Sequence, residues 1–546
     1  MQGQYFGQNK VRYKTMDFKV LKTQHFDVYY YQDDTQMAPV VGRMAERWYA
    51  RLSQIFNHDL SSRQPVIIYA SPTDFRSTTV IPGELGEATG GVTEPLRRRV
   101  VIPLAGPLAE TDHVLGHELV HAFQYDIALG RSGGGGLENA PLFRVPLWFI
   151  EGMAEYLSLG PVDANTAMWM RDAVLQDKLP KIKDLNNPKY FPYRWGQSLW
   201  AYIGGTFGDD SIGPLLRAAG RSGDALAAIK AVLHQPAQDL SKSWQQALKS
   251  QYAPVLEDTT TLQQQGHLLI SKKKNGGGSD LNVSPAVSPD GKQIAFFSAK
   301  ELFSIDLFLA SANSGEIGKK LTSTAVSPTI ESLGFINSAG AWSKDGKYLA
   351  FNEIVSGHPQ LVIYDVQHGH SIEHIPLKNL GEVFTPTWSP DGTQIAFSAL
   401  VNGITDLFVA DVRTKAVRRL TNDKFADMQP AWSPDGSSIA FVTDRFQTQL
   451  EGLDYGPMQL ALFRVATGKI EQVPAFTEGK QINPEWSPDG RRLYFVSDRD
   501  GVDNIYSVAL ADGSLRQITD IQTGISGITA LSPAFSVAAH SGKLVY

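Results

Sequence analysis

The stretch PTWSPDGTQIAF, from Pro386 to Phe397, decides the fold of the second half of the chain because it recurs along the sequence. Its Asp-Gly pair supplies the positive φ angles of a tight hairpin, and the alternating apolar residues that follow predict a strand. The other intact copies are PAVSPDGKQIAF at Pro285, GAWSKDGKYLAF at Gly340, PAWSPDGSSIAF at Pro430 and PEWSPDGRRLYF at Pro484. The Asp-Gly turns lie 44 to 55 residues apart. Four short strands in a unit of this length are typical of a β-propeller blade.

A degenerate sixth copy, PAFSVAAHSGKLVY, begins at Pro533. We therefore expect an all-β propeller over residues 283–546, with about six blades and the last one incomplete. The sixth blade would lack its outer strands, which favours a ring closed in an unusual way or a longer natural chain. The motif W-S-P-D-G-x-x-I-A-F resembles the TolB-type propeller family, whose members are commonly periplasmic or extracytoplasmic. The resemblance therefore implies a periplasmic or secreted protein.

Residues 1–257 have a different texture, which predicts an α+β domain. Strand-like and helix-like stretches are mixed, and the signal from Thr111 to Tyr252 is mostly helical. Residues 258–282 are polar and contain Gly276-Gly277-Gly278, so they predict a linker or a first propeller strand. The expected strands of the first domain are Phe18–Tyr31, Pro65–Ala70 and Arg99–Leu104, and its first expected helix is Met37–Ile55.

Composition narrows the classes of function. The chain has 546 residues, a formal net charge of −6 and a pI near 6.1, which give no electrostatic case for nucleic-acid binding. No apolar run is long enough for a transmembrane segment in this chain. Residues 1–13 lack an apolar h-region, so no signal peptide is predicted in it. Cysteine is absent, which leaves any metal to histidine and carboxylate ligands.

The first domain contains an H-E-x-x-H pentad, His117-Glu118-Leu119-Val120-His121. On a helix, residues four apart share a face, so both histidines can reach one metal ion while Glu118 projects beside them as a general base. Thr111 and Asp112 are candidate N-caps for this helix. His113 lies one turn earlier and could compete as a ligand, and a histidine-rich solvent face is the simpler alternative.

Catalytic zinc keeps three protein ligands, so a third ligand is needed. The candidate is Glu151 in W-F-I-E-G-M-A-E-Y, where Glu155 follows one turn later. Gluzincin peptidases, among them thermolysin and the zinc aminopeptidases, pair the pentad with a downstream glutamate, and WFIEGMAEY is similar to the W-L-N-E-G motif of the aminopeptidases. The resemblance implies that Glu151 is a zinc ligand and that Glu155 orients a zinc-ligating histidine. A solvated helix face is the alternative for Glu155.

The segment Phe191-Pro192-Tyr193-Arg194-Trp195-Gly196 is similar to the P-Y-E-K-G of the aminopeptidases. The resemblance implies that Tyr193 binds the oxyanion, facing the zinc from the side opposite Glu118. Packing in an aromatic core is the alternative for Tyr193, and Tyr190 is a possible substitute. Their amine-binding G-A-M-E-N motif has no counterpart in Gly86–Gly91, which favours an endopeptidase. The strand Arg99–Leu104 could pair with an extended peptide at a sheet edge, or be an ordinary strand.

The ensemble resembles a bacterial peptidase-MA-like zinc domain fused to a TolB-type propeller. The expected function is hydrolysis of a peptide or protein substrate, with the propeller as a binding or gating module that could hold a protein partner. Two alternatives stay open: a non-catalytic propeller scaffold with a structural or decayed zinc domain, and a zinc hydrolase of a non-peptide substrate. The glycine run Gly133–Gly136 between the two motifs predicts a surface loop, either a lid or a connection.

Overall fold

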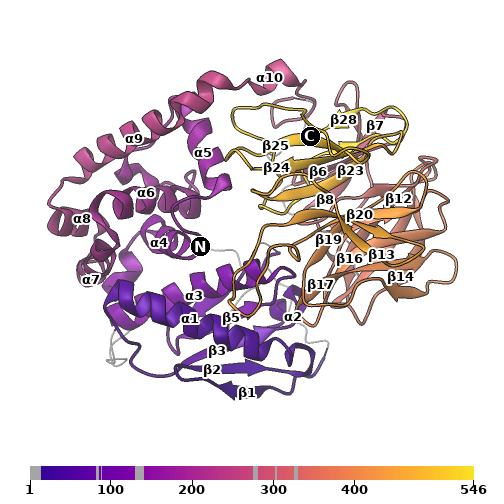
Figure 1. Cartoon of the computed structure of the whole chain (residues 1–546). Helices are drawn as coiled ribbons and strands as arrows, with labels where there is room; N and C mark the ends of the chain where they lie inside the picture. Colours follow the sequence, from indigo (N-terminus) through magenta and orange to yellow (C-terminus); the bar gives the residue numbers. More distant parts are fainter. Residues whose placement is uncertain are drawn as a thin grey trace.

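The computed structural model describes residues 14–81, 85–87, 89–129, 140–274, 281–301, 304–324, 327 and 330–546. The expectations for residues 1–13, Gly133–Gly136 and Gly276–Gly278 lie outside these residues. The chain folds into an N-terminal α/β region and a C-terminal β-propeller, which lie against each other (Figure 1).

A five-stranded mixed sheet forms the base of the first domain, in the order β1-β2-β3-β5-β4. Helix α1 packs on β2 and α3 packs on β5. The sheet therefore has its C-terminal pair, β5 and β4, next to the helix that carries the pentad. The strands are β1 Lys19–Lys22, β2 Phe26–Tyr30, β3 Gln64–Tyr69, β4 Val92–Glu94 and β5 Arg99–Pro103.

Of the two interpretations of Arg99–Leu104, the ordinary strand is confirmed and the peptide-binding edge is wrong; the expected N-caps of the pentad helix are also wrong. Strand β5 lies between β3 and β4, so it cannot accept an added peptide strand; the edge position belongs to β4. Helix α3 begins at Leu108, a turn before the expected caps. Thr111 instead bonds the backbone of Ala105, and Asp112 accepts from the indole of Trp48 at 3.0 Å. Thr111 thus bonds the loop just before the helix, and Asp112 bonds a distant residue of α1, so neither side chain caps α3.

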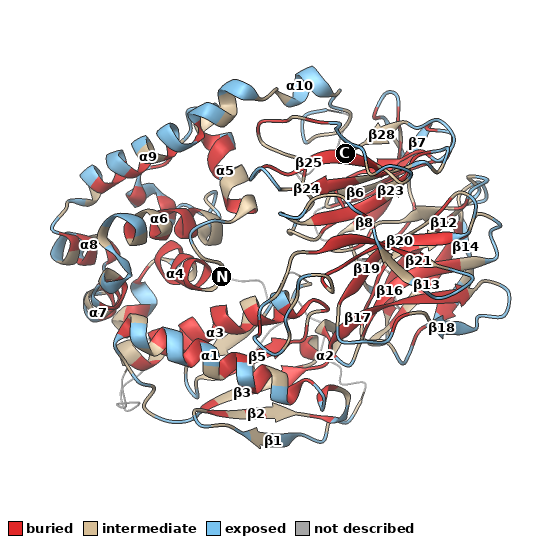
Figure 2. Ribbon diagram, in the orientation of Figure 1, coloured by how far each residue is buried: buried red, intermediate tan, exposed pale blue. Residues whose placement is uncertain are grey.

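The rest of the first domain is helical, and its helices bury their inner faces around a shared core with the sheet. Figure 2 shows α3 and α4 as mostly buried, whereas α9 and α10 expose their outer sides. None of the helices in the described residues is long and apolar enough to cross a membrane. The helices are α1 Ala38–Phe56, α2 Pro72–Arg76, α3 Leu108–Leu129, α4 Leu147–Leu159, α5 Ala164–Leu175, α6 Pro192–Phe207, α7 Ile212–Ser222, α8 Ala225–Leu233, α9 Ala237–Asp258 and α10 Leu262–Gln265, with short 3-10 turns at Gln32–Asp34, Pro141–Arg144, Ile182–Asn186 and Asp209–Ser211.

The propeller has five blades, each an antiparallel sheet built from one intact repeat and the strands around it. The blades are β6 Asn282–Val287, β7 Gln293–Ser298, β8 Asp306–Ser311 and β9 Ile317–Lys320; β10 Ile330–Leu333, β11 Ala341–Trp342, β12 Tyr348–Val355, β13 His358–Asp365 and β14 His370–Pro376; β15 Val383–Trp388, β16 Gln394–Val401, β17 Ile404–Asp411 and β18 Val417–Arg419; β19 Asp427–Trp432, β20 Ser438–Thr443, β21 Gln459–Arg464 and β22 Ile470–Gln472; and β23 Gln481–Trp486, β24 Arg492–Ser497, β25 Asn504–Ala509 and β26 Leu515–Gln517.

The expectation of about six blades is therefore wrong. The degenerate sixth repeat supplies only two short strands, β27 Ser536–Val537 and β28 Leu544–Val545, which pair with each other and form no four-stranded sheet. They lie against β6 of the first blade, and β27 also contacts β23 of the fifth. Asn483 on β23 accepts hydrogen bonds from the backbone of Ala534 and Phe535 at 2.8 and 3.0 Å. A two-stranded hairpin thus closes the ring between the fifth and first blades.

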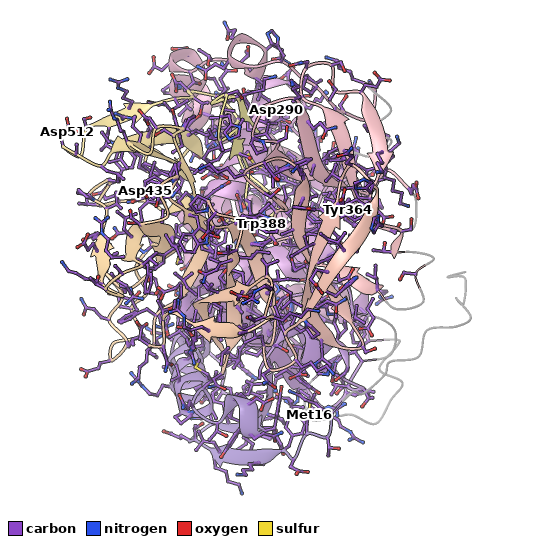
Figure 3. All side chains as sticks on the ribbon, turned by 90° about the vertical axis from the view of Figure 1, so that its right-hand side faces the viewer. Met16, Asp290, Tyr364, Trp388, Asp435 and Asp512 are labelled. Carbon is purple, nitrogen blue, oxygen red and sulfur yellow. The ribbon has the colours of Figure 1, made fainter. Side chains whose placement is uncertain are left out.

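The residues of the repeat motif have identifiable tasks. In every intact repeat the serine hydroxyl donates to the aspartate at 2.6–2.7 Å, and the glycine has a φ of +69° to +75°. The indoles of Trp342, Trp388 and Trp486 donate to carbonyls of the preceding blade at 2.9–3.1 Å. The motif therefore forms each hairpin and, through these tryptophans, joins neighbouring blades. In Figure 3, Asp290 and Asp435 mark two of these turns in the propeller, above Met16 of the first domain.

Buried polar contacts hold the two domains together. Arg171 on α5 is only 2% exposed and donates to the carbonyls of Gln522 and Gly501, both at 3.0 Å. On another side of the interface, Glu87 accepts from the backbone amides of Phe335 and Ile336 at 3.1 and 3.2 Å. The propeller is thus anchored to the helical part and to the loop that precedes β4.

Candidate metal centre

Three side chains from two helices meet at one point. Helix α3 places His117 and His121 one turn apart, and α4, which begins after the N-cap Pro146, places Glu151 opposite them. The Nε2 atoms of the two histidines are 3.2 Å apart, and Oε2 of Glu151 is 3.2 Å from each. We call these three residues the triad. A buried group of this kind could hold a metal ion.

The other ring nitrogen of each histidine is held by a separate partner. Nδ1 of His121 lies 2.8 Å from Oε1 of Gln124, whose amide group donates to the carbonyl of Ile150 at 3.0 Å. This pattern assigns the Nδ1 proton to His121 and leaves its Nε2 lone pair for the centre. Nδ1 of His117 lies 3.1 Å from Oε1 of Glu155, an ion-pair contact without the geometry of a hydrogen bond.

The triad fits a tetrahedral metal ion. Ligand bonds of about 2.0–2.1 Å at tetrahedral angles put donor atoms roughly 3.3 Å apart, close to the separations seen here. The carboxylates around the triad also favour a positive charge at this position. Although burial opposes it, Glu151, Glu155 and Glu118 raise the pKa of His117 to about 10, so without a metal this ring takes up a proton. Metal binding would displace that proton.

The side chain of Glu118 projects from α3 and is held by a hydrogen bond from the edge strand β4. The hydroxyl of Thr93 on β4 donates to Oε2 of Glu118 at 2.6 Å, and burial raises the pKa of this carboxyl. A Cβ at Gly91 would lie 2.9 Å from Cγ of Glu118, so this position has room only for glycine unless Glu118 moves. Sequence reasoning missed Thr93 and Gly91, because both act across a long sequence separation.

Glu155 is 6% exposed and does not lie on a solvated helix face. Besides His117, its carboxylate lies 3.7 Å from Nε2 of His113 and 3.7 Å from Nη1 of Arg194. His113 remains outside the triad, with its ring centroid 6.2 Å from that of His117, and burial lowers its pKa to about 4. His113 therefore contacts Glu155 and is not a member of the triad.

Tyr193 lies at the start of α6, beside the triad. Its ring stacks on that of His117 with centroids 5.8 Å apart. Burial, reinforced by the charges of Glu151 and Glu118, raises the pKa of its phenol above the usual range. Tyr190 packs instead against Trp195, with centroids 5.4 Å apart. The position of Tyr193 relative to a bound metal stays a prediction.

A second tyrosine near the triad was not predicted. Tyr125 follows His121 by one turn, and the two ring centroids are 6.3 Å apart. Burial and the charges of Glu151 and Glu118 raise its pKa to about 12. The i, i+4 spacing of His117, His121 and Tyr125 was a signal that could have identified it.

Comparisons with known proteins identify the propeller. Residues 335–450 match the family described as TolB beta propeller domain. Solved TolB structures are similar to part of the chain: TolB from Acinetobacter baumannii at 21% identity, with a TM-score of 0.35, over 43% of this chain and 53% of that one. Putative TolB from Agrobacterium tumefaciens gives 21% identity and a TM-score of 0.38, over 48% and 88% of the two chains.

A curated relative bears the description of a peptidase. The chain is 44% identical over 50 residues to the "Uncharacterized peptidase YuxL" of Bacillus subtilis (strain 168). This match covers 9% of the chain and only 8% of that relative's length. The family match over residues 335–450 and the fold show that the second half of the chain contains a TolB-type β-propeller domain.

Proposed function

We propose that the chain is a zinc-dependent peptidase of the gluzincin type, and that the α/β region is its zincin-like catalytic domain. The observation that carries the proposal is the convergence of His117, His121 and Glu151 at 3.2 Å, with Glu118 next to them on the same helix. Two imidazoles and one carboxylate are a ligand set typical of catalytic zinc, whereas structural zinc fills all four positions with protein ligands. The short match to a relative described as a peptidase agrees with peptidase activity in general, and does not bear on the metal.

The residues around the triad have distinct roles in amide hydrolysis. The chemistry that zinc supplies when bound is Lewis-acid polarisation of a carbonyl and a lower pKa for water. Glu118 takes the proton of the attacking water and later delivers it to the leaving amine. Its buried carboxyl, with a raised pKa, suits both steps. Tyr193 donates a hydrogen bond to the oxyanion, and Glu155 holds His117 in the orientation that keeps Nε2 free.

The propeller serves as a binding or gating module in this proposal. It contacts α5, which packs on α6, and the loop before β4, the strand whose Thr93 bonds Glu118. The substrate is a peptide or protein, and endopeptidase activity is favoured because no amine-binding motif is present. By analogy with TolB-type propellers, we place the protein in the periplasm or outside the cell.

The test is to screen the zinc-loaded protein against a peptide library and to repeat the assay with Glu118→Gln. We expect the variant to retain zinc and to lose about 10²- to 10⁴-fold in turnover, the usual contribution of a general base. The exposed substitution Glu257→Gln serves as a matched control. Zinc binding without cleavage of any peptide would favour a scaffold, and cleavage of an ester or another bond alone would favour a non-peptide substrate.

A further inference from the structure

A line of aromatic rings runs from the triad to the protein surface. The ring of Tyr193, stacked on His117, has its centroid 5.0 Å from that of Phe191, which in turn lies 5.8 Å from Trp169 on α5. We call Trp169, Phe191 and Tyr193 the aromatic track. Phe191 is 44% exposed and Trp169 is 39% exposed, although Arg171 on the same helix is buried against the propeller.

The rings of the track are held in place by the backbone and by an ion pair. Phe191 is the N-cap of α6 with an extended backbone, and Pro192 occupies the first helical position. Arg194 then joins the start of α6 to the start of α5, where Nη1 lies 3.0 Å from Oδ1 of Asp163. Asp163 also caps α5 by accepting from the amide of Thr166 at 2.7 Å. The track is therefore a preorganised surface.

Single exposed apolar side chains are ordinary in folded proteins, but contacting exposed rings that continue into a reactive centre are not. Ring faces attract other rings and aliphatic groups, and the phenyl ring of Phe191 offers no hydrogen-bonding group to a sugar hydroxyl. An extended peptide held at the triad spaces its side chains by about 3.3 Å per residue. A side chain close to the cleaved bond can then reach Phe191 and Trp169.

We propose that the aromatic track is a specificity subsite that takes an aromatic side chain of the peptide substrate near the scissile bond. This inference rests on the proposed peptidase function and names its substrate class. Phe191 and Trp169 form the walls of the subsite, and Tyr193 joins the subsite to the triad.

The test compares kcat/KM for pairs of peptides that are identical except at one position, which holds phenylalanine in one peptide and alanine in the other. A separate pair is made for each position around the cleaved bond, and the quantity compared is the ratio of the two kcat/KM values. At one of these positions the wild-type protein should favour phenylalanine, and Phe191→Ala and Trp169→Ala should each reduce that ratio about tenfold. Phe18→Ala is the matched control, because Phe18 is 40% exposed and its ring contacts are Tyr31 and Tyr69 instead of the track. It should leave the ratio unchanged.

A second measurement separates this inference from the proposed function. Zinc-loaded Glu118→Gln is titrated with the phenylalanine and alanine peptides, and the difference in affinity is compared with and without Phe191→Ala. Stronger binding of the phenylalanine peptide that disappears with Phe191→Ala supports the subsite, even if no peptide is cleaved. Cleavage with a preference that neither track variant changes overturns the inference and leaves the peptidase proposal standing. Binding of a chitooligosaccharide at Trp169 in place of the peptide also overturns it.

Discussion

The propeller hairpins and the metal centre use polar side chains in opposite ways. The serine–aspartate hydrogen bond of the repeat occurs in all five blades with nearly the same length, and each turn aspartate has a lowered pKa because its serine donates to it. The triad of the centre occurs once in the described residues, and both of its histidines contact the same carboxylate oxygen of Glu151. A single substitution in one propeller hairpin should therefore have a small effect on stability, because four similar hairpins remain. A single substitution in the metal centre should have a large effect on activity.

Tyr193→Phe, a substitution beside the metal centre, should have a large effect on activity. Removal of the phenol should reduce turnover on a cleaved peptide about 10²- to 10³-fold, as is usual for the loss of one oxyanion donor, while peptide binding changes little. Steady-state kinetics with zinc-loaded protein measures both quantities. Tyr190→Phe is the matched control, since Tyr190 packs on Trp195 away from the triad. Full turnover in Tyr193→Phe would show that Tyr193 only packs on His117.

Gly392→Ala, a substitution in one of the five propeller hairpins, should have a small effect on stability. The position has a φ of +71° and an added Cβ would meet no atom within 4 Å, so the substitution adds backbone strain alone. We expect a loss of about 1–2 kcal/mol in the free energy of unfolding, with peptidase activity retained. Denaturant unfolding measures the loss. Gly318→Ala, which also has open space and no positive φ, should cost nothing or stabilise β9 slightly. Equal effects in both variants would contradict the account of the hairpins.

Glu87→Gln should produce the smallest effect, and one that depends on pH. Burial and the charge of Glu382 raise the pKa of Glu87 to about 8, although Arg76 opposes the shift. The folded state therefore keeps a proton on Glu87 that the unfolded chain releases above about pH 4.5. This difference in proton binding stabilises the folded state, and the stabilisation is lost as the pH rises from about 4.5 to about 8. Glutamine keeps the acceptor for Phe335 and Ile336 without the charge. The Tm of the variant, relative to wild type, should rise by a few degrees between pH 5 and pH 8.5; a difference independent of pH would contradict this.

Sequence reasoning succeeded where the information is local. The Asp-Gly hairpins predicted the propeller because each turn is decided by adjacent residues, and the i, i+4 spacing of His117 and His121 placed both rings on one face of α3. The first helix also followed from the spacing of its apolar residues, and the strands near Phe26 and Val66 followed from their aromatic, β-branched and apolar composition.

Features that depend on distant contacts were missed or mistaken. The blade count was wrong because ring closure depends on how β27 packs between β23 and β6, not on the repeat itself. Thr93 reaches Glu118 from a strand 25 residues earlier, and no local pattern marks that pair. The assignments of Glu151 and Tyr193 came from a resemblance to known peptidases, because their distance from the pentad carries no periodic signal.

Zinc binding tests the central claim most directly. Metal-free protein titrated with zinc should bind one equivalent at the triad, and X-ray absorption should show nitrogen and oxygen neighbours at about 2.0–2.1 Å. Glu151→Ala and His117→Ala should each weaken binding by more than the roughly 10- to 100-fold typical of losing a group that only orients a ligand. The control His267→Ala, at an exposed histidine, should bind zinc like the wild type. Zinc affinity that Glu151→Ala leaves unchanged, or no tight zinc binding at all, would contradict the account.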